Sequence, residues 1–214
     1  FKFPDFGEAG VMARTDYIVN SKYDLTAFVT LAKLNSREGR PACVRTRDGG
    51  KSWQLIAFIG PEPPGRDYAI MPSSVRLSSD SILTVFRRRF WIEAWRSDDN
   101  GRWWKFKNIP VPDTGRGNPP SMVKLSDGRI ALTYGFRAKP YGIRARLSSD
   151  NGETWGSEVI LRQDGGNWDL GYTQTVQRID GKLITIYYYN NDPAAERYIG
   201  GTIWDPGKGK GLTQ

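Results

Sequence analysis

The sequence predicts an all-β protein, a β-propeller built from four-stranded antiparallel blades. Three observations predict it: a composition rich in glycine and aromatic residues, a turn motif that recurs at a fixed interval, and hydrophobic strands repeated between those turns. The 214 residues include 24 Gly, 13 Pro and 8 Trp, which suits short strands joined by tight turns. Signals for helices are nearly absent, so the regular structure is expected to be strand.

The turn motif occurs three times, in residues 46–53, 97–104 and 148–155, as Ser/Thr-x-Asp-x-Gly-x-Ser/Thr-Trp. The middle copy departs once, with Trp103 in the second hydroxyl position, and successive aspartates stand 51 residues apart. In such a turn the Asp carboxylate accepts backbone N–H groups, the Gly adopts a positive φ and the Trp packs against its own blade. We therefore interpret this Asp-box motif as a structural hairpin turn.

Each repeat also contains a hydrophobic strand that follows a tight turn. These strands are expected at Ile82–Arg87, Ile130–Phe136 and Leu183–Tyr189. A full repeat then consists of strand, turn, strand, loop, strand, Asp-box turn and strand, which is a four-stranded blade. Four such repeats are predicted, at about 11–60, 68–110, 117–162 and 170–205.

The predicted blades occupy residues 1–206 as one propeller domain. Residues 207–214 are expected to form a flexible C-terminal tail, because they are rich in Gly and Lys and follow the last predicted strand.

Two residue counts exclude whole classes of chemistry. The chain has no His and one Cys, which removes Ser-His-Asp and Cys-His catalysis, His-ligated metals, Cys-rich zinc sites and any intrachain disulfide. Neither a metal nor a cofactor is expected. Proton transfer would have to use carboxylates, Tyr or Lys.

The net charge of +8 favours an acidic partner. Many arginines lie within predicted strands rather than in a basic tail, so an acidic glycan is expected and nucleic acid is not. No apolar run approaches 18 residues, so no membrane span is expected. No signal peptide is visible in a chain that begins at Phe1, yet a secreted or periplasmic location is favoured. The sequence indicates no particular oligomeric state.

At its Asp boxes the chain resembles the sialidase (neuraminidase) superfamily, whose bacterial members are six-bladed propellers. The resemblance covers roughly residues 11–205. It implies an exo-α-sialidase type of glycoside hydrolase, in which arginines bind the substrate carboxylate and a tyrosine is the nucleophile. With four repeats, the chain is expected to be either a fragment of a six-bladed ring or an unusually small propeller.

The resemblance implies a role for each of several residues. For the arginines that bind the carboxylate, it points to Arg14, to Arg87 and to Arg144, with Arg137 as the rival of Arg144. The nucleophile that it implies is Tyr172, which stands in a Gly-Tyr-Thr sequence before Asp-Gly.

The carboxylates that such an enzyme needs match less well. Glu38 and Asp16 are the candidates for the acid/base, and Met71 stands where the resemblance implies a Glu beside the nucleophile. Asp169 is expected to form a turn or to support the site from behind. The alternative is a non-catalytic Asp-box propeller that binds an acidic glycan or a protein partner, and the Met71 position favours it. A different enzyme on the same scaffold is a further alternative, since a fold does not determine a function.

Overall fold

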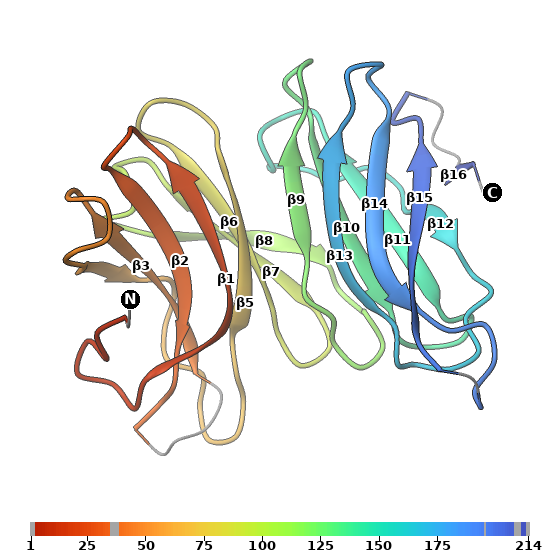
Figure 1. The fold of residues 1–214 in the computed structure, drawn as a ribbon, viewed down its shortest axis with the longest axis horizontal. Helices are drawn as coiled ribbons and strands as arrows, with labels where there is room; N and C mark the ends of the chain where they lie inside the picture. The colour runs from red at the N-terminus through yellow and green to blue at the C-terminus, as the bar shows by residue number, and fades with distance from the viewer. Residues whose placement is uncertain (1–2, 35–38, 195, 208–210, 213–214) are drawn as a thin grey trace. The chain divides into compact units, whose positions relative to one another are not determined.

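The computed structural model describes residues 3–34, 39–194, 196–207 and 211–212, with the backbone alone for 13–14 and 211–212. These residues form strands β1 to β16 and contain no helix. The strands make up four antiparallel sheets of four strands each, in which neighbours in sequence are neighbours in the sheet (Figure 1). This arrangement confirms the prediction of an all-β propeller fold. Among the described residues, no helix is long and apolar enough to cross a membrane.

Each sheet is one blade, and its strands follow one another in chain order. Blade 1 consists of β1 (Val11–Val19), β2 (Leu25–Leu31), β3 (Arg40–Thr46) and β4 (Gln54–Phe58). Blade 2 consists of β5 (Ile70–Arg76), β6 (Ile82–Arg87), β7 (Ile92–Ser97) and β8 (Lys105–Val111). Blade 3 consists of β9 (Ser121–Lys124), β10 (Ile130–Phe136), β11 (Gly142–Ser148) and β12 (Val159–Arg162). Blade 4 consists of β13 (Gly171–Gln177), β14 (Leu183–Tyr189), β15 (Tyr198–Trp204) and β16 (Gly211–Leu212).

The chain divides into two compact units. The first contains blade 1 and most of blade 2, and the second contains blades 3 and 4. In the first unit, one face of blade 1 packs on blade 2 through Phe28, Phe86 and Trp104. The rings of Phe28 and Trp104 meet edge to face, with centroids 6.2 Å apart, a favoured aromatic geometry. The other face of blade 1 is covered by Phe3 and Phe6.

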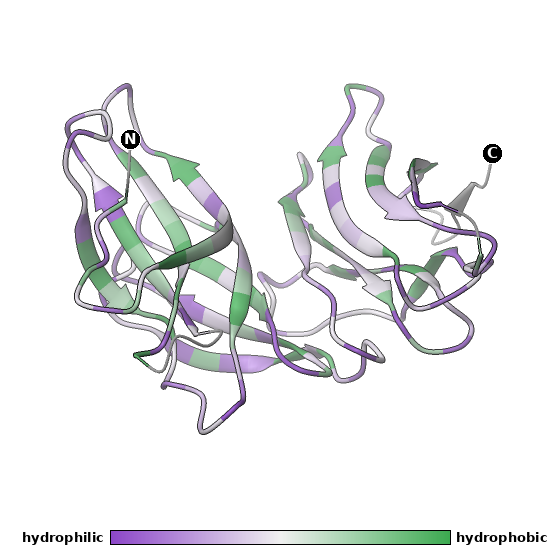
Figure 2. Ribbon diagram, turned by 60° about the horizontal axis from the view of Figure 1, so that its bottom comes forward, coloured by the Kyte–Doolittle hydropathy of each residue, from purple (hydrophilic) through white to green (hydrophobic). Residues whose placement is uncertain are grey.

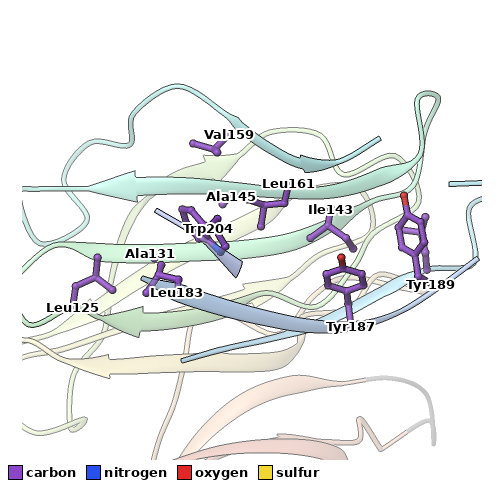
Figure 3. Packing of buried hydrophobic residues seen from close by; sticks show 11 residues of the cluster. Leu125, Ala131, Ile143, Ala145, Val159, Leu161, Leu183, Tyr187, Tyr189 and Trp204 are labelled. Atoms are coloured by element: carbon purple, nitrogen blue, oxygen red, sulfur yellow. The ribbon is translucent and has the colours of Figure 1, made fainter. Parts of the chain in front are cut away.

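The core of the second unit lies between blades 3 and 4. Figure 3 shows its side chains, among them Ile143 and Leu161 from blade 3 and Tyr187 and Trp204 from blade 4. Along many strands hydrophobic and hydrophilic residues alternate (Figure 2), because successive side chains of a strand point to opposite faces of the sheet. Burying this apolar surface is the main favourable contribution to folding.

Buried threonines link the inner strands within the second unit. The hydroxyl of Thr175 lies 2.7 Å from that of Thr133 and 2.9 Å from that of Thr185. The first unit has a similar pair, Ser74 and Thr84, at 2.9 Å. Buried hydroxyls stay favourable only when hydrogen-bonded, so these contacts fix how inner strands pair.

The Asp boxes form the hairpin turns that the motif predicts. In the first box, Asp48 accepts hydrogen bonds from the hydroxyl of Thr46 at 2.8 Å and from the backbone N–H of Ser52 at 3.0 Å. In the third, Asp150 accepts the same bonds from Ser148 at 2.8 Å and Thr154 at 2.9 Å. The turn carboxylate thus satisfies backbone donors that a hairpin leaves open.

Hydrogen bonds to carboxylates, in the Asp boxes and at Asp24, make the stability of the fold depend on pH. Bonds from the hydroxyl and then the N–H of Thr154 lower the pKa of Asp150 to about 2, and the Arg45 guanidinium lowers that of Asp24 to about 2. Between about pH 4 and pH 2 the unfolded chain therefore binds more protons than the folded chain. We expect the thermal unfolding midpoint to fall across this interval and to stay nearly constant just above it.

Measuring that midpoint by circular dichroism from pH 6 to pH 2 checks the expectation. The variant Asp150→Asn should show a smaller fall, because its side chain no longer titrates. An unfolding midpoint that stays level down to pH 2 in the parent protein would contradict the argument.

The flexible tail expected at residues 207–214 stays a prediction. Two residues of this segment form a short strand, in which Gly211 pairs with Trp204 and Leu212 with Ile203. The physical reason is the outer edge of β15, whose unpaired backbone groups can bind another strand. A following segment that is long enough to return to this edge can pair with it, and β16 does so and completes blade 4.

Candidate functional site

The inner strand of blade 4 contains an irregularity where it begins. The pairing of β13 with β14 shifts between Gly171 and Gln174, and within this bulge Tyr172 has a φ of 54°. The inner strand of blade 2 has the same bulge, where Met71 has a φ of 58°. A positive φ is unfavourable for residues other than Gly, and such strain gathers at functional sites. The bulges mark the first residues of β13 and β5 as candidate sites.

Asn118 holds the blade 4 bulge in place. Its buried amide oxygen accepts the N–H groups of Tyr172 and Gly135, both at 3.1 Å, and its amide nitrogen donates to the carbonyl of Leu170 at 3.0 Å. Gly171 has a φ of 114°, and a Cβ added there would lie 2.3 Å from the Asn118 amide nitrogen. Glycine is therefore needed at residue 171 for this close approach.

Five side chains meet beside this bulge, and we call them the tyrosine cluster: Tyr172, Tyr188, Arg137, Asp169 and Arg197. The rings of Tyr172 and Tyr188 have centroids 5.6 Å apart. The Arg137 guanidinium lies 5.8 Å from the Tyr172 ring centre. Tyr172 is 37% exposed, so it is accessible to a ligand.

Arg137 is the most deeply buried member of the cluster, with 7% of its surface exposed. It donates from Nε to the carbonyl of Leu170 at 3.0 Å and from Nη1 to that of Gly117 at 3.2 Å. Its Nη2 donates to the Tyr188 hydroxyl at 2.6 Å. These bonds fix the position of the positive charge next to the phenol.

The Tyr188 phenol in turn donates to Asp169 at 2.8 Å, and the other oxygen of Asp169 pairs with Arg197 at 2.9 Å. Burial raises the pKa of Tyr188 to about 12, against the opposing effect of the Arg137 charge and with a further rise from Asp169. A phenol between a carboxylate and a guanidinium can pass its proton to the carboxylate while the guanidinium stabilises the phenolate. The cluster thus has the geometry of a nucleophile and its base.

An exposed indole lies at the rim of the cluster. The guanidinium of Arg137 is 5.6 Å from the Trp168 ring centre, and that of Arg116 is 5.3 Å from it. A tryptophan that is partly exposed beside polar groups is a common part of ligand-binding surfaces.

The structure brings Tyr172 and Arg137 together, and it places Arg144 elsewhere. Arg144 is buried on β11, donating to the carbonyls of Arg162 and Pro140 at 3.1 Å each. Its Nε lies 3.2 Å from Glu158, close enough for an ion pair, although the two are not aligned as a hydrogen bond. Arg144 is therefore tied to its own blade, and Arg137 is the arginine beside the tyrosine.

Arg87 ends β6 in the first unit. Its Nη2 donates to the Tyr68 hydroxyl at 3.3 Å, whereas its buried Nε has no hydrogen-bond partner among the described residues. The next two arginines are paired, Arg88 with Glu93 at 3.2 Å and Arg89 with Asp67 at 3.4 Å. A guanidinium with donors to spare suits an anion, so the sequence-based assignment of Arg87 to anion binding stays a prediction.

The remaining predicted residues lie in or near blade 1. Asp16 accepts the N–H of Ser74 at 2.5 Å and that of Tyr17 at 2.8 Å, so it joins strands β1 and β5. The role of Asp16 as acid/base stays a prediction. Arg14 belongs to β1, but its side chain lies outside the described part of the chain, as does Glu38 altogether.

Sequence reasoning did not include Tyr188 or Arg197, and for Asp169 it left open a turn or a role in supporting the site. One signal could have indicated Tyr188, namely its position in the repeat. Tyr188 is equivalent to Arg87, because Tyr188 pairs with Gly171 in blade 4 as Arg87 pairs with Ile70 in blade 2. Counting along the two repeats would have put Tyr188 at the position of Arg87. Nothing in the sequence indicates that Asp169 and Arg197 approach it, since Arg197 comes from the far side of a hairpin.

The bulge gives a prediction about stability. Replacing Asn118 by Ala leaves the N–H groups of Tyr172 and Gly135 without their acceptor and removes one of the two donors to the carbonyl of Leu170, so we expect a loss of about 2–4 kcal/mol in the free energy of unfolding. Chemical denaturation measures it. The matched control is Gln174→Ala on the exposed side of β13, for which a change within about 0.5 kcal/mol is expected. Equal effects of the two substitutions would contradict the role given to Asn118.

The repeated blades, their Asp-box turns and the polar cluster at the end of an inner strand define an Asp-box β-propeller protein. Residues 21–185 match the family described as BNR repeat-like domain. The chain therefore belongs to the BNR repeat-like family. A search of curated proteins finds no match.

Solved structures share the fold. A Dyadobacter fermentans DSM 18053 protein of unknown function has a TM-score of 0.76 at 24% identity, over 92% of this chain and 54% of that one. A Penicillium chrysogenum α-L-arabinanase complexed with arabinobiose has a TM-score of 0.68 at 15% identity, over 96% and 66% of the two chains. The K499G mutant of the Streptococcus pneumoniae sialidase NanB has 0.55 at 15%, over 88% and 30%.

These likenesses extend to the fold alone, because all three identities lie below 25%. This chain spans about half the length of the Dyadobacter protein. The neighbours with a stated activity are glycoside hydrolases of differing substrates, which gives the fold a chemical context without choosing a substrate.

Proposed function

We propose that this protein is a glycoside hydrolase of the exo-α-sialidase type, acting on a terminal acidic sugar at the tyrosine cluster. The observation that supports it is the phenol of Tyr188, hydrogen-bonded to Asp169 at 2.8 Å and to Arg137 at 2.6 Å, with exposed Tyr172 beside it. A nucleophile, its base and a charge that stabilises the anion are what such a reaction requires.

In the proposed reaction the phenol oxygen of Tyr188 bonds to the anomeric carbon as the glycosidic C–O bond breaks. The phenol proton moves to Asp169, and the departing oxygen takes a proton from solvent. Water then cleaves the sugar–tyrosine bond, the phenolate regains a proton from Asp169, and one proton returns to solvent. A neutral phenol is a suitable nucleophile for a carbon that already bears a carboxylate, because it avoids repulsion between like charges.

The acidic character of the sugar is supported by the cations around the cluster. Arg116 and Arg197 join Arg137 at its border, and the whole chain has a charge of +8. The sequence analysis proposed Tyr172 as the nucleophile. In the present proposal Tyr172 instead contacts the bound substrate. Tyr188 takes the reactive role because its hydrogen bond to a carboxylate supplies the base.

The test is hydrolysis of 4-methylumbelliferyl glycosides of sialic acid, α-L-arabinofuranose and β-xylose between pH 4 and pH 8. The sialoside is expected to be cleaved fastest. Faster cleavage of the arabinofuranoside would overturn the acidic substrate while retaining the hydrolase. No release of fluorophore from any of the three would remove the enzymatic proposal.

A second candidate function is binding of an acidic glycan without cleavage. The high pKa of Tyr188, about 12 because of its burial, favours it, since moving the phenol proton to Asp169 costs more free energy than it would for an exposed tyrosine. Calorimetric titration with sialyllactose separates the two candidates: heat of binding with no released sialic acid supports binding alone.

A further inference from the structure

The three Asp boxes differ in one hydrogen bond. In the first box the hydroxyl of Ser52 donates to the second carboxylate oxygen of Asp48 at 2.6 Å, and in the third that of Thr154 donates to Asp150 at 2.5 Å. We call such a box closed, because both carboxylate oxygens of its aspartate accept hydrogen bonds from residues of the same turn. In both boxes the second carboxylate oxygen thus already accepts a hydroxyl of the turn.

The middle box keeps the same turn but is not closed. The N–H of Trp103 donates to Oδ1 of Asp99 at 2.9 Å, and the Ser97 hydroxyl donates to the same oxygen at 2.8 Å. Trp103 has no side-chain hydroxyl, and the hydrogen bonds that the Asp99 carboxylate accepts from the described residues all end on Oδ1. Oδ2 of Asp99 is left as an acceptor.

A small hollow lies at this open box. It has a volume of about 190 Å³ and is lined by Arg96, Asp98, Asp99, Trp103 and Lys105, all within the first unit. Trp103 is 67% exposed, so the face of its indole ring is accessible to a ligand. Arg96 is paired with Asp98 at 2.8 Å, which holds one wall of the hollow in place.

These groups match the chemistry of a sugar ring. An indole offers a flat apolar face to the C–H side of the ring, a carboxylate oxygen accepts its hydroxyls, and a lysine ammonium donates to its oxygens. The hollow is smaller than the roughly 300–1,000 Å³ of pockets for drug-sized ligands, so it suits a single ring. Its lining has two carboxylates, Asp98 and Asp99, and two cations, Arg96 and Lys105. These charges balance, so the hollow has no net charge to attract an acidic sugar and the expected ligand is neutral.

We propose that the hollow formed by Trp103, Asp99 and Lys105 binds a neutral sugar unit of a glycan chain. This site consists of residues other than those of the tyrosine cluster and does not depend on the function proposed there. A single stacked ring gives a weak complex, with an expected Kd in the millimolar range. Such a site would hold a polysaccharide on the blade without cleaving it.

The experiment titrates the protein with xylotriose and arabinotriose as neutral probes and trigalacturonate as the acidic probe, followed by saturation-transfer NMR and tryptophan fluorescence. At least one neutral probe is expected to bind, and more tightly than trigalacturonate. Trp103→Thr should weaken that binding at least about tenfold, equivalent to about 1.4 kcal/mol, whereas Trp103→Tyr should stay within about threefold of the parent because a ring remains.

Trp103→Thr is also its own folding control, because it restores the consensus hydroxyl and lets the box close on Asp99. Its thermal midpoint is expected to equal or exceed that of the parent protein. Phe106→Thr removes an aromatic ring that is 52% exposed on β8, three residues after Trp103, and that does not line the hollow, so binding should be unchanged. Failure of both neutral probes to bind, undiminished binding by a folded Trp103→Thr, or tighter binding of trigalacturonate would each overturn the proposal.

Discussion

Hydrolysis of the fluorogenic sialoside is expected to fall at least about 10³-fold when Tyr188 is replaced by Phe, because the nucleophile and the proton that Asp169 accepts are both lost. The substitution removes one oxygen atom and keeps the ring that packs against Tyr172. Steady-state kinetics give kcat, and single-turnover measurements show whether the bond-breaking step itself has slowed.

The neighbouring residue provides the control. Tyr187 lies on the same strand, but it is buried on the opposite face, with its hydroxyl 2.5 Å from that of Thr202. Tyr187→Phe should lower stability by about 1 kcal/mol and leave kcat within about twofold. If Tyr188→Phe keeps its activity while Tyr172→Phe loses it, the nucleophile is Tyr172, as the resemblance to sialidases implies.

The largest effect on stability is expected from Trp204→Ala. Trp204 is fully buried between blades 3 and 4 (Figure 3), and its indole N–H donates to the Thr185 hydroxyl at 3.0 Å. Removing the ring leaves a cavity and takes one of two hydrogen bonds from the buried Thr185 hydroxyl, which together are expected to lower the free energy of unfolding by about 3–5 kcal/mol. Urea denaturation followed by circular dichroism measures the change.

Ile203 is the matched comparison, because it precedes Trp204 on β15 and is 36% exposed on the other face. Ile203→Ala should lower the unfolding free energy by about 1 kcal/mol or less, since a partly exposed side chain loses little burial. A loss from Trp204→Ala no larger than that from Ile203→Ala would show that the packing between blades 3 and 4 contributes little to stability.

The local pattern was enough to predict the blades. The strands Ile82–Arg87, Ile130–Phe136 and Leu183–Tyr189 begin and end as predicted, and the Asp-box turns have the expected bonds. Both kinds of element depend on residues that are close in sequence: alternation with a period of two gives the strand, and Asp and Gly a few residues apart give the turn. The strand β16 depends on the edge of β15, and the sequence around it contains no strand signal.

The site depended on contacts between residues that are far apart along the chain. Arg137 and Arg144 stand seven residues apart, and the sequence favours Arg144. Packing alone directs Arg137 to Tyr188 and Arg144 to Glu158. Asp169 reaches Tyr188 because the antiparallel pairing of β13 with β14 places Gly171, two residues after Asp169, opposite Tyr188. Periodicity therefore predicts strands and turns, whereas the partners of a charged side chain follow from how blades pack.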